Sequence, residues 1–248
     1  MSRSCAIAFL HGYLGVLPRL YWSGLRRLHA DLRARGHLVL MPQTYLTRPV
    51  EDRAEHVWRR VRSVSGGMPV ILVGHSMGGL DARRIASHLD PEQRVTAVIT
   101  MGTPHRGSAL AEQVPTAKGF MAWVMRTFDR GGTADLTPAR MALFNAVTPN
   151  RPDIFYASVN GARPSGEMPF RALAQTAADL ERLRGPNDGL IDLASAAWGD
   201  PVIAVRADHY ELAGLSLARA DPASARPYDA PPNLRRLVDR AVSYAASV

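Results

Sequence analysis

The chain is poor in cysteine: Cys5 is the only one among its 248 residues, so no disulfide can form within it. Disulfides belong mainly to oxidising compartments, and this composition favours a reducing one. No apolar run approaches the roughly 20 residues of a membrane-spanning helix. The apolar run Cys5–Leu10 is too short for a signal peptide and precedes no small-residue cleavage site. We therefore expect a cytoplasmic protein, or a secreted one if a leader has been removed.

Lysine is also nearly absent. Lys118 is the only one, so arginine carries almost all of the positive charge behind the net charge of +8. The arginines are scattered over several predicted helices, in pairs such as Arg26–Arg27 and Arg59–Arg60, which is typical of solvated helix faces. A nucleic-acid-binding protein would show a clustered basic stripe with interleaved aromatics. We expect no nucleic-acid partner, while peripheral contact with an anionic lipid surface stays open.

The most informative stretch is VILVGHSMGG, Val70–Gly79. Its apolar, β-branched first half is typical of a buried strand, and helical spacing begins at Met77. A serine between glycines at such a strand-to-helix turn is the pattern of a nucleophile elbow. Glycine is expected at positions 74 and 78 because side chains there would collide with the neighbouring strand and helix. Ser76 is therefore the predicted nucleophile.

Strands alternate with helices along most of the chain, which indicates βαβ units. We predict an α/β-hydrolase fold: a mostly parallel six-stranded sheet flanked by helices, in a single domain over residues 1–248. Strands are expected over Cys5–Leu10, His37–Met41, Val70–Val73, Val95–Met101, Ile154–Val159 and Pro201–Val205. Helices are expected over Leu20–Arg35, Glu51–Ser65, Met77–Leu89, Phe170–Leu183 and Asn233–Val248.

Residues 107–150 interrupt the alternation. Between Phe120 and Phe128 the segment is apolar on nearly every side, and glycines flank it. A mobile apolar segment at this place in an α/β enzyme suits a lid or cap that excludes water from an acyl chain. A plain core helix is the alternative interpretation.

The order Ser, then Asp or Glu, then His along the chain selects the partners of Ser76. Of the eight histidines, His209 alone follows the last predicted strand; the other seven lie at or before residue 105. His209 is therefore the predicted base. The predicted acid is Asp188, in the turn that follows the penultimate strand and helix, with Asp192 as the second candidate.

The loop His11–Gly15 follows the first strand, where serine hydrolases place a second oxyanion donor. The backbone N–H groups of Tyr13 and Met77 are the predicted oxyanion hole. In the expected reaction, Ser76 attacks an acyl carbonyl while His209 takes its proton. Water then hydrolyses the acyl-enzyme.

Taken together, these stretches resemble the true lipases of the Pseudomonas/Burkholderia type, which are bacterial triacylglycerol lipases of the α/β-hydrolase superfamily. The similarity rests on five motifs in order: Leu10–Gly15, Gly74–Gly79, Gly102–Ser108, Asn187–Leu190 and Asp208–Glu211, with a weaker match at Tyr21-Trp22 and Val159–Gly161. The resemblance implies a Ser76–His209–Asp188 triad, Tyr13 and Met77 as oxyanion donors, and an acyl ester or lipid as substrate.

The chain departs from that family in three ways. The family is secreted, whereas no leader is evident here. Many members have a disulfide near the acid loop, but Ala194 stands where one cysteine would fall. The resemblance also implies a structural calcium beside the triad histidine; Glu211 occupies one ligand position, and the segment before Asp188 is short. We expect no metal and no cofactor, with a structural calcium as the alternative, and these departures favour an esterase on shorter esters.

The leading hypothesis is a carboxylic-ester hydrolase, lipase or esterase. An acyltransferase or a polyester (polyhydroxyalkanoate) depolymerase would use the same triad. A non-enzymatic binding protein on this scaffold would be expected to have lost a triad member, and this chain retains all three. The sequence does not decide chain-length preference, stereoselectivity or oligomeric state.

Overall fold

The computed structural model describes residues 4–13, 15, 21–113, 127, 129–215 and 230–247. Within these residues, six strands form one sheet in the order β2-β1-β3-β4-β5-β6, and every neighbouring pair is parallel. The strands are β1 (Ala6–Leu10), β2 (Leu38–Leu40), β3 (Val70–His75), β4 (Val95–Met101), β5 (Phe155–Gly161) and β6 (Val202–Val205). The predicted fold class is confirmed, and the sheet is parallel throughout.

Alternate residues of the strands enter two separate cores, because successive side chains of a strand point to opposite faces. In β1, Ile7 and Phe9 join the core on one face, while Ala6, Ala8 and Leu10 join the core on the other. Each of these five residues is at most 1% exposed. A strand that is buried on both faces explains why its sequence is apolar without polar alternation.

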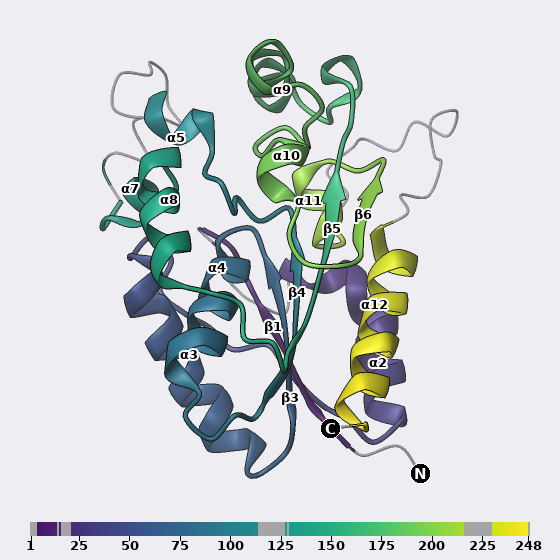
Figure 1. The fold of residues 1–248 in the computed structure, drawn as a ribbon. Coiled ribbons are helices and arrows are strands. Elements are labelled where there is room, and N and C mark those ends of the chain that lie inside the picture. Colours follow the sequence, from purple (N-terminus) through teal and green to yellow (C-terminus); the bar gives the residue numbers. More distant parts are fainter. Residues whose placement is uncertain are drawn as a thin grey trace.

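Helices cover both faces of the sheet (Figure 1). The amphipathic helices α2 and α12 pack on the face that holds Ile7 and Phe9, whereas α3 and α4 cover the other face. The longer helices are α2 (Arg26–Ala34), α3 (Val50–Ser65), α4 (Met77–Arg84), α8 (Pro138–Val147), α9 (Arg171–Arg184) and α12 (Ala230–Ala245). The shorter ones are α5 (Ala109–Gln113), α7 (Gly132–Asp135), α10 (Leu193–Ala196) and α11 (His209–Leu212), with single turns at Ser23–Leu25, Ile85–Leu89 and Ser165–Glu167.

Two helix boundaries differ from the sequence expectation. A 3-10 turn over Ser23–Leu25 interrupts the helix expected over Leu20–Arg35, and α2 begins at Arg26. The last helix begins at Ala230, so its first turn contains two prolines. Proline lacks an N–H, and the first turn of a helix is where an N–H finds no helical partner, so proline is tolerated there.

The segment expected to form a lid is described in part. Its described portion contains α5, α7 and α8, which lie together at one side of the molecule (Figure 1). The apolar stretch between Phe120 and Phe128 falls largely outside the described residues, and the lid stays a prediction. In the part of the chain that the structure describes, no helix is both long and apolar enough to cross a bilayer.

Candidate active site

Ser76 sits at the sharp turn between β3 and α4. Its backbone has φ 53° and ψ −129°, a conformation that non-glycine residues rarely adopt. The turn is held from both sides: Ser76 N–H donates to Met101 O at 2.9 Å, and Thr103 Oγ1 donates to Ser76 O at 2.9 Å. From Pro69 to Arg83, Ser76 is the one residue that is not fully buried. The strained turn therefore presents the serine side chain to solvent.

The glycines around Ser76 are required by space. A Cβ atom on Gly74 would lie 2.4 Å from Gly78 O, and one on Gly78 would lie 2.2 Å from Leu10 O. Both distances are far inside contact with backbone atoms, so neither position admits a side chain. The expected collisions with the following helix and the neighbouring strand are thus present.

The loop after β1 lies directly against Ser76, the predicted nucleophile. A Cβ atom on Gly12 would lie 2.7 Å from Ser76 Cβ and 3.2 Å from Ser76 Oγ. Any side chain at position 12 would therefore occupy the space beside the serine oxygen. Of the two predicted oxyanion donors, Tyr13 directly follows Gly12, and Met77 directly follows Ser76 and begins α4.

His11 orients the peptide that carries the Tyr13 N–H. Its Nε2 accepts from Thr44 N–H at 3.2 Å, so the ring proton lies on Nδ1, which donates to Gly12 O at 2.9 Å. In a trans peptide the C=O and the following N–H point in opposite directions. The Tyr13 N–H therefore points away from His11. Burial lowers the pKa of His11 to about 4, which keeps the ring neutral in this tautomer.

The predicted base and acid are paired. His209 Nδ1 lies 2.7 Å from Asp188 Oδ2, and the other carboxylate oxygen, Asp188 Oδ1, accepts from Leu190 N–H at 2.9 Å and Ile191 N–H at 2.7 Å. His209 N–H also donates to Asp188 O at 2.8 Å. Both side chains are at most 6% exposed. The ring is thus held by its Nδ1, and its Nε2 is left for a second partner.

His75 connects His209, the predicted base, to the strand that leads into Ser76. Its ring lies 4.6 Å from the His209 ring, centroid to centroid, and its Nε2 lies 2.8 Å from His209 O. His75 directly precedes Ser76, so this contact fixes the turn that carries His209 against the elbow. The pKa of His75 lies well below its ordinary value, first because the ring is buried and then because His209 is close.

Tyr21 completes a hydrogen-bond chain that sequence reasoning did not assign. Its hydroxyl accepts from Gly12 N–H at 3.2 Å and bonds His75 Nδ1. The His209 carbonyl oxygen can only accept, so His75 carries its proton on Nε2 and donates it there, and the unprotonated Nδ1 accepts from the Tyr21 hydroxyl. These hydrogen bonds link the loop after β1 to the turn of His209 through the part-buried Tyr21 and the buried His75. The Tyr21-Trp22 match in the family resemblance was the sequence signal for it.

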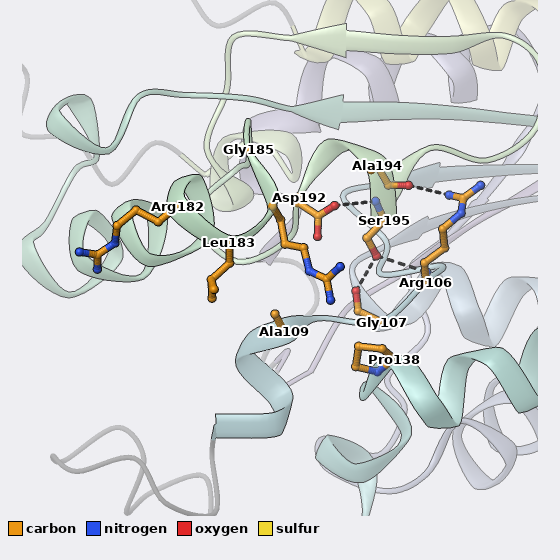
Figure 2. Close-up of a pocket in the computed structure, with 11 residues that line it drawn as sticks. Arg106, Gly107, Ala109, Pro138, Arg182, Leu183, Gly185, Asp192, Ala194 and Ser195 are labelled. Carbon is orange, nitrogen blue, oxygen red and sulfur yellow. Dashed lines mark hydrogen bonds between the residues drawn. The ribbon is translucent and has the colours of Figure 1, made fainter.

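Asp192, the second candidate for the acid, has another role. Its Oδ1 accepts from Ser195 N–H at 2.8 Å and caps α10. Figure 2 shows Asp192 on the wall of a cavity of about 480 Å³, together with Arg106, Gly107 and Ser195. Ser76, Asp188 and His209 do not line this cavity. Asp192 thus holds the start of the short helix that follows the acid turn.

A buried ion pair that the sequence did not reveal supports the same loop. Arg53 on α3 and Asp81 on α4 are both 0% exposed, and Arg53 Nη2 lies 2.8 Å from Asp81 Oδ2. Arg53 Nη2 also donates to His11 O at 2.8 Å. Burial raises the pKa of Asp81 to about 6, and the Arg53 charge opposes that rise. The pair ties two helices to the backbone next to Gly12.

The residues beside His209 do not fit the calcium that the resemblance implies. Asp208 and Glu211 flank His209, but the Arg163 guanidinium lies between their carboxylates, with Nη1 2.7 Å from Glu211 Oε1 and 3.4 Å from Asp208 Oδ2. A guanidinium thus takes the position that a cation would need. Across the described residues, no group of three or more His, Cys, Asp or Glu side chains is placed to hold a metal ion.

Comparison with known proteins assigns the family. Residues 7–192 match the α/β-hydrolase fold family, and the chain belongs to that family. Its relatives include Triacylglycerol lipase 2 of Saccharomyces cerevisiae, 28% identical over 201 residues, which cover 76% of this chain and 60% of that protein. A triacylglycerol lipase of Burkholderia plantarii is 31% identical over 133 residues, which cover 51% of this chain and 34% of the relative. The chain is distantly homologous to triacylglycerol lipases and spans at most 60% of the length of these two.

Solved structures show the same fold. The mature form of the Bacillus licheniformis lipase BlEst2 superposes with a TM-score of 0.73 at 23% identity, covering 85% of this chain and 87% of that one. A metagenomic carboxyl esterase superposes with a TM-score of 0.78 at 18% identity, covering 98% of this chain and 77% of that one. The family places this chain among lipase- and esterase-like α/β hydrolases.

Proposed function

We propose that the protein is a carboxylic-ester hydrolase that uses Ser76 as nucleophile, His209 as base and Asp188 as the orienting acid. The observation that carries the proposal is the buried His209–Asp188 pair, in which Nδ1 and Oδ2 lie 2.7 Å apart. His75 bonds the backbone of His209, and the next residue along the chain is the strained, partly exposed Ser76. A positioned base that is itself oriented by a third group is the arrangement that activates a serine hydroxyl.

The proposed reaction proceeds in two halves. The Ser76 hydroxyl attacks the acyl carbonyl carbon, and its proton passes to His209 Nε2. The negative charge that develops on the carbonyl oxygen is bound by the N–H groups of Tyr13 and Met77, and each such donor is worth about 2.7–4 kcal/mol in transition-state stabilisation. His209 then protonates the leaving alcohol, and water, deprotonated by the same ring, releases the acid from the acyl-enzyme.

Asp188 serves His209 in both halves. Its Oδ2 accepts the Nδ1 proton, so Nε2 is the free ring nitrogen, and it stabilises the imidazolium that forms when Nε2 is protonated. Two backbone N–H groups on Oδ1 keep the carboxylate from rotating. The substrate class follows from the relatives: triacylglycerol lipases act on acyl esters, and a short acyl ester is the substrate that we propose here.

An aryl-ester series from C2 to long chains, measured on the wild type, Ser76→Ala and Ser63→Ala, tests the proposal. Ser63 is an exposed serine on α3, so its replacement should leave kcat/KM unchanged, whereas Ser76→Ala should abolish turnover. Undiminished hydrolysis by Ser76→Ala would overturn the mechanism. A preference for long chains over C2–C4 esters would replace the esterase with a lipase.

The two acids provide a matched pair of variants. Asp188→Asn should lower kcat by about 10⁴-fold, because the amide favours the wrong tautomer of the base. Asp192→Asn should leave kcat within about twofold, since asparagine caps a helix as well as aspartate does. Equal losses in the two variants would contradict the assignment of Asp188.

A further inference from the structure

A buried cluster of two acids and one arginine lies behind the catalytic histidine. We propose that Arg163 is a positioning residue, a covalently attached cation that holds the turn of His209 in place; this inference rests on the proposed function. Arg163 would take the place of the calcium ion that the family resemblance implies. Its guanidinium contacts the side chains on both sides of His209 but not His209 itself.

The turn of His209 is built from two carboxylates that need a cation. Asp208 Oδ1 accepts from the N–H groups of Tyr210 and Glu211 at 2.9 and 3.0 Å, and Glu211 Oε2 accepts from Asp208 N–H at 3.0 Å. This reciprocal cap fixes α11, which begins at His209. It also holds two acidic side chains together at 0% and 5% exposure. Like charges at such burial repel, and a positive charge beside them offsets that repulsion.

Arg163 supplies that charge from a different part of the chain. It follows the end of β5, and its backbone N–H donates to Asn187 O at 2.9 Å, next to Asp188. Its side chain then reaches Glu211 at 2.7 Å and Asp208 at 3.4 Å. One residue therefore binds the acid turn through its backbone and the base turn through its guanidinium. This arrangement sets the separation of the two turns that carry Asp188 and His209.

A cation that is part of the chain cannot be removed by a chelator. Wild-type activity and melting temperature should therefore be the same in a calcium chelator and in added calcium. Loss of activity in the chelator, restored by calcium, would overturn the proposal, because it would show that an ion and not Arg163 holds the turn.

Arg163→Ala and Arg163→Lys test the role directly. Alanine leaves the two buried acids without a partner, and we expect the melting temperature to fall by roughly 5–10 °C. The base should also be misplaced, so kcat should fall roughly 10–100-fold with little change in KM. Lysine keeps the charge and should recover part of both losses. The matched control is Arg206→Ala, which breaks a surface ion pair between Arg206 (54% exposed) and Glu167 (41% exposed). It should change neither the melting temperature nor kcat.

The double variant Arg163→Ala/Glu211→Gln separates charge from packing. Removing one acid relieves the repulsion, so the double variant should melt above Arg163→Ala. A double variant that melts below the single one, or an Arg163→Ala that melts and turns over like the wild type, would overturn the proposal. The melting temperatures do not depend on turnover, so they still report on Arg163 if Ser76→Ala shows that the proposed function is wrong.

Discussion

Arg53→Met is the substitution whose cost the structure defines most fully. Arg53 is 0% exposed, and its guanidinium bonds the Asp81 carboxylate through Nε and Nη2, His11 O through Nη2 and Tyr45 O through Nη1. Methionine fills much of the same volume but donates no hydrogen bond. The variant therefore leaves Asp81 as a buried carboxyl without its cation, and it frees the backbone next to Gly12.

The magnitude follows from the burial of the pair. Breaking a buried ion pair by removing one partner costs about 3–5 kcal/mol, and at about 2–4 °C per kcal/mol for a chain of this size the melting temperature should fall by roughly 6–20 °C. Without Arg53, the folded-state pKa of Asp81 should rise further above its unfolded value. A group whose pKa is raised by folding favours the folded state at low pH, and this contribution is lost as pH rises through the folded-state pKa. The loss in melting temperature should thus be larger at about pH 8 than at about pH 5.

Thermal unfolding by circular dichroism at the two pH values provides the assay. The control is Arg62→Ala, which breaks an exposed pair with Glu92 at 50% and 40% exposure and should cost at most about 1 kcal/mol. The proposed esterase activity should also fall in Arg53→Met, because His11 O loses a donor beside the predicted oxyanion loop. An Arg53→Met protein that melts within about 2 °C of the wild type at both pH values would refute the reasoning.

Three further substitutions probe the loop, the hydrogen-bond chain and a buried histidine. Gly12→Ala should lower kcat/KM by at least about 100-fold, because the new methyl lies 2.7 Å from Ser76 Cβ; wild-type activity would contradict the contact. Tyr21→Phe removes the hydroxyl between Gly12 and His75 and should lower kcat about tenfold in steady-state assays. An unchanged kcat would show that the hydrogen bonds through Tyr21 have no part in catalysis. Burial lowers the pKa of His29 to about 4, so its stabilisation is complete above pH about 6.5 and is lost as pH falls through about 4. His29→Phe should therefore melt progressively higher relative to the wild type as pH falls over that range, and parallel melting curves would contradict this.

Local pattern sufficed for the fold because each element is specified by residues close together in the sequence. The run Val70–Val73 has the length and β-branching typical of a buried strand, and the glycines after it allow a sharp turn. Chain order was equally informative for His209, since it is the one histidine beyond the last strand. The structure pairs it with Asp188 and gives Asp192 to the cap of α10.

The supporting residues could not be predicted because their partners lie far apart in the sequence. Arg53 meets Asp81 28 residues away, and Arg163 meets Glu211 48 residues away. An arginine on an amphipathic helix is typical of a solvated face, although helical spacing places Arg53 on the same buried stripe as Val57 and Val61. That local signal does not reveal the partner, because a buried guanidinium needs a carboxylate that only tertiary packing brings beside it.

The central claim is that Ser76 is the activated nucleophile, and covalent labelling tests it most directly. The wild type is treated with an alkyl fluorophosphonate, which reacts with activated serines, and the intact protein and its peptides are measured by mass spectrometry. We expect a single adduct on the peptide that contains Ser76, formed much more slowly in His209→Ala and absent in Ser76→Ala. An esterase that is active but carries the adduct on another residue, or reacts at Ser76 equally fast without His209, would contradict it.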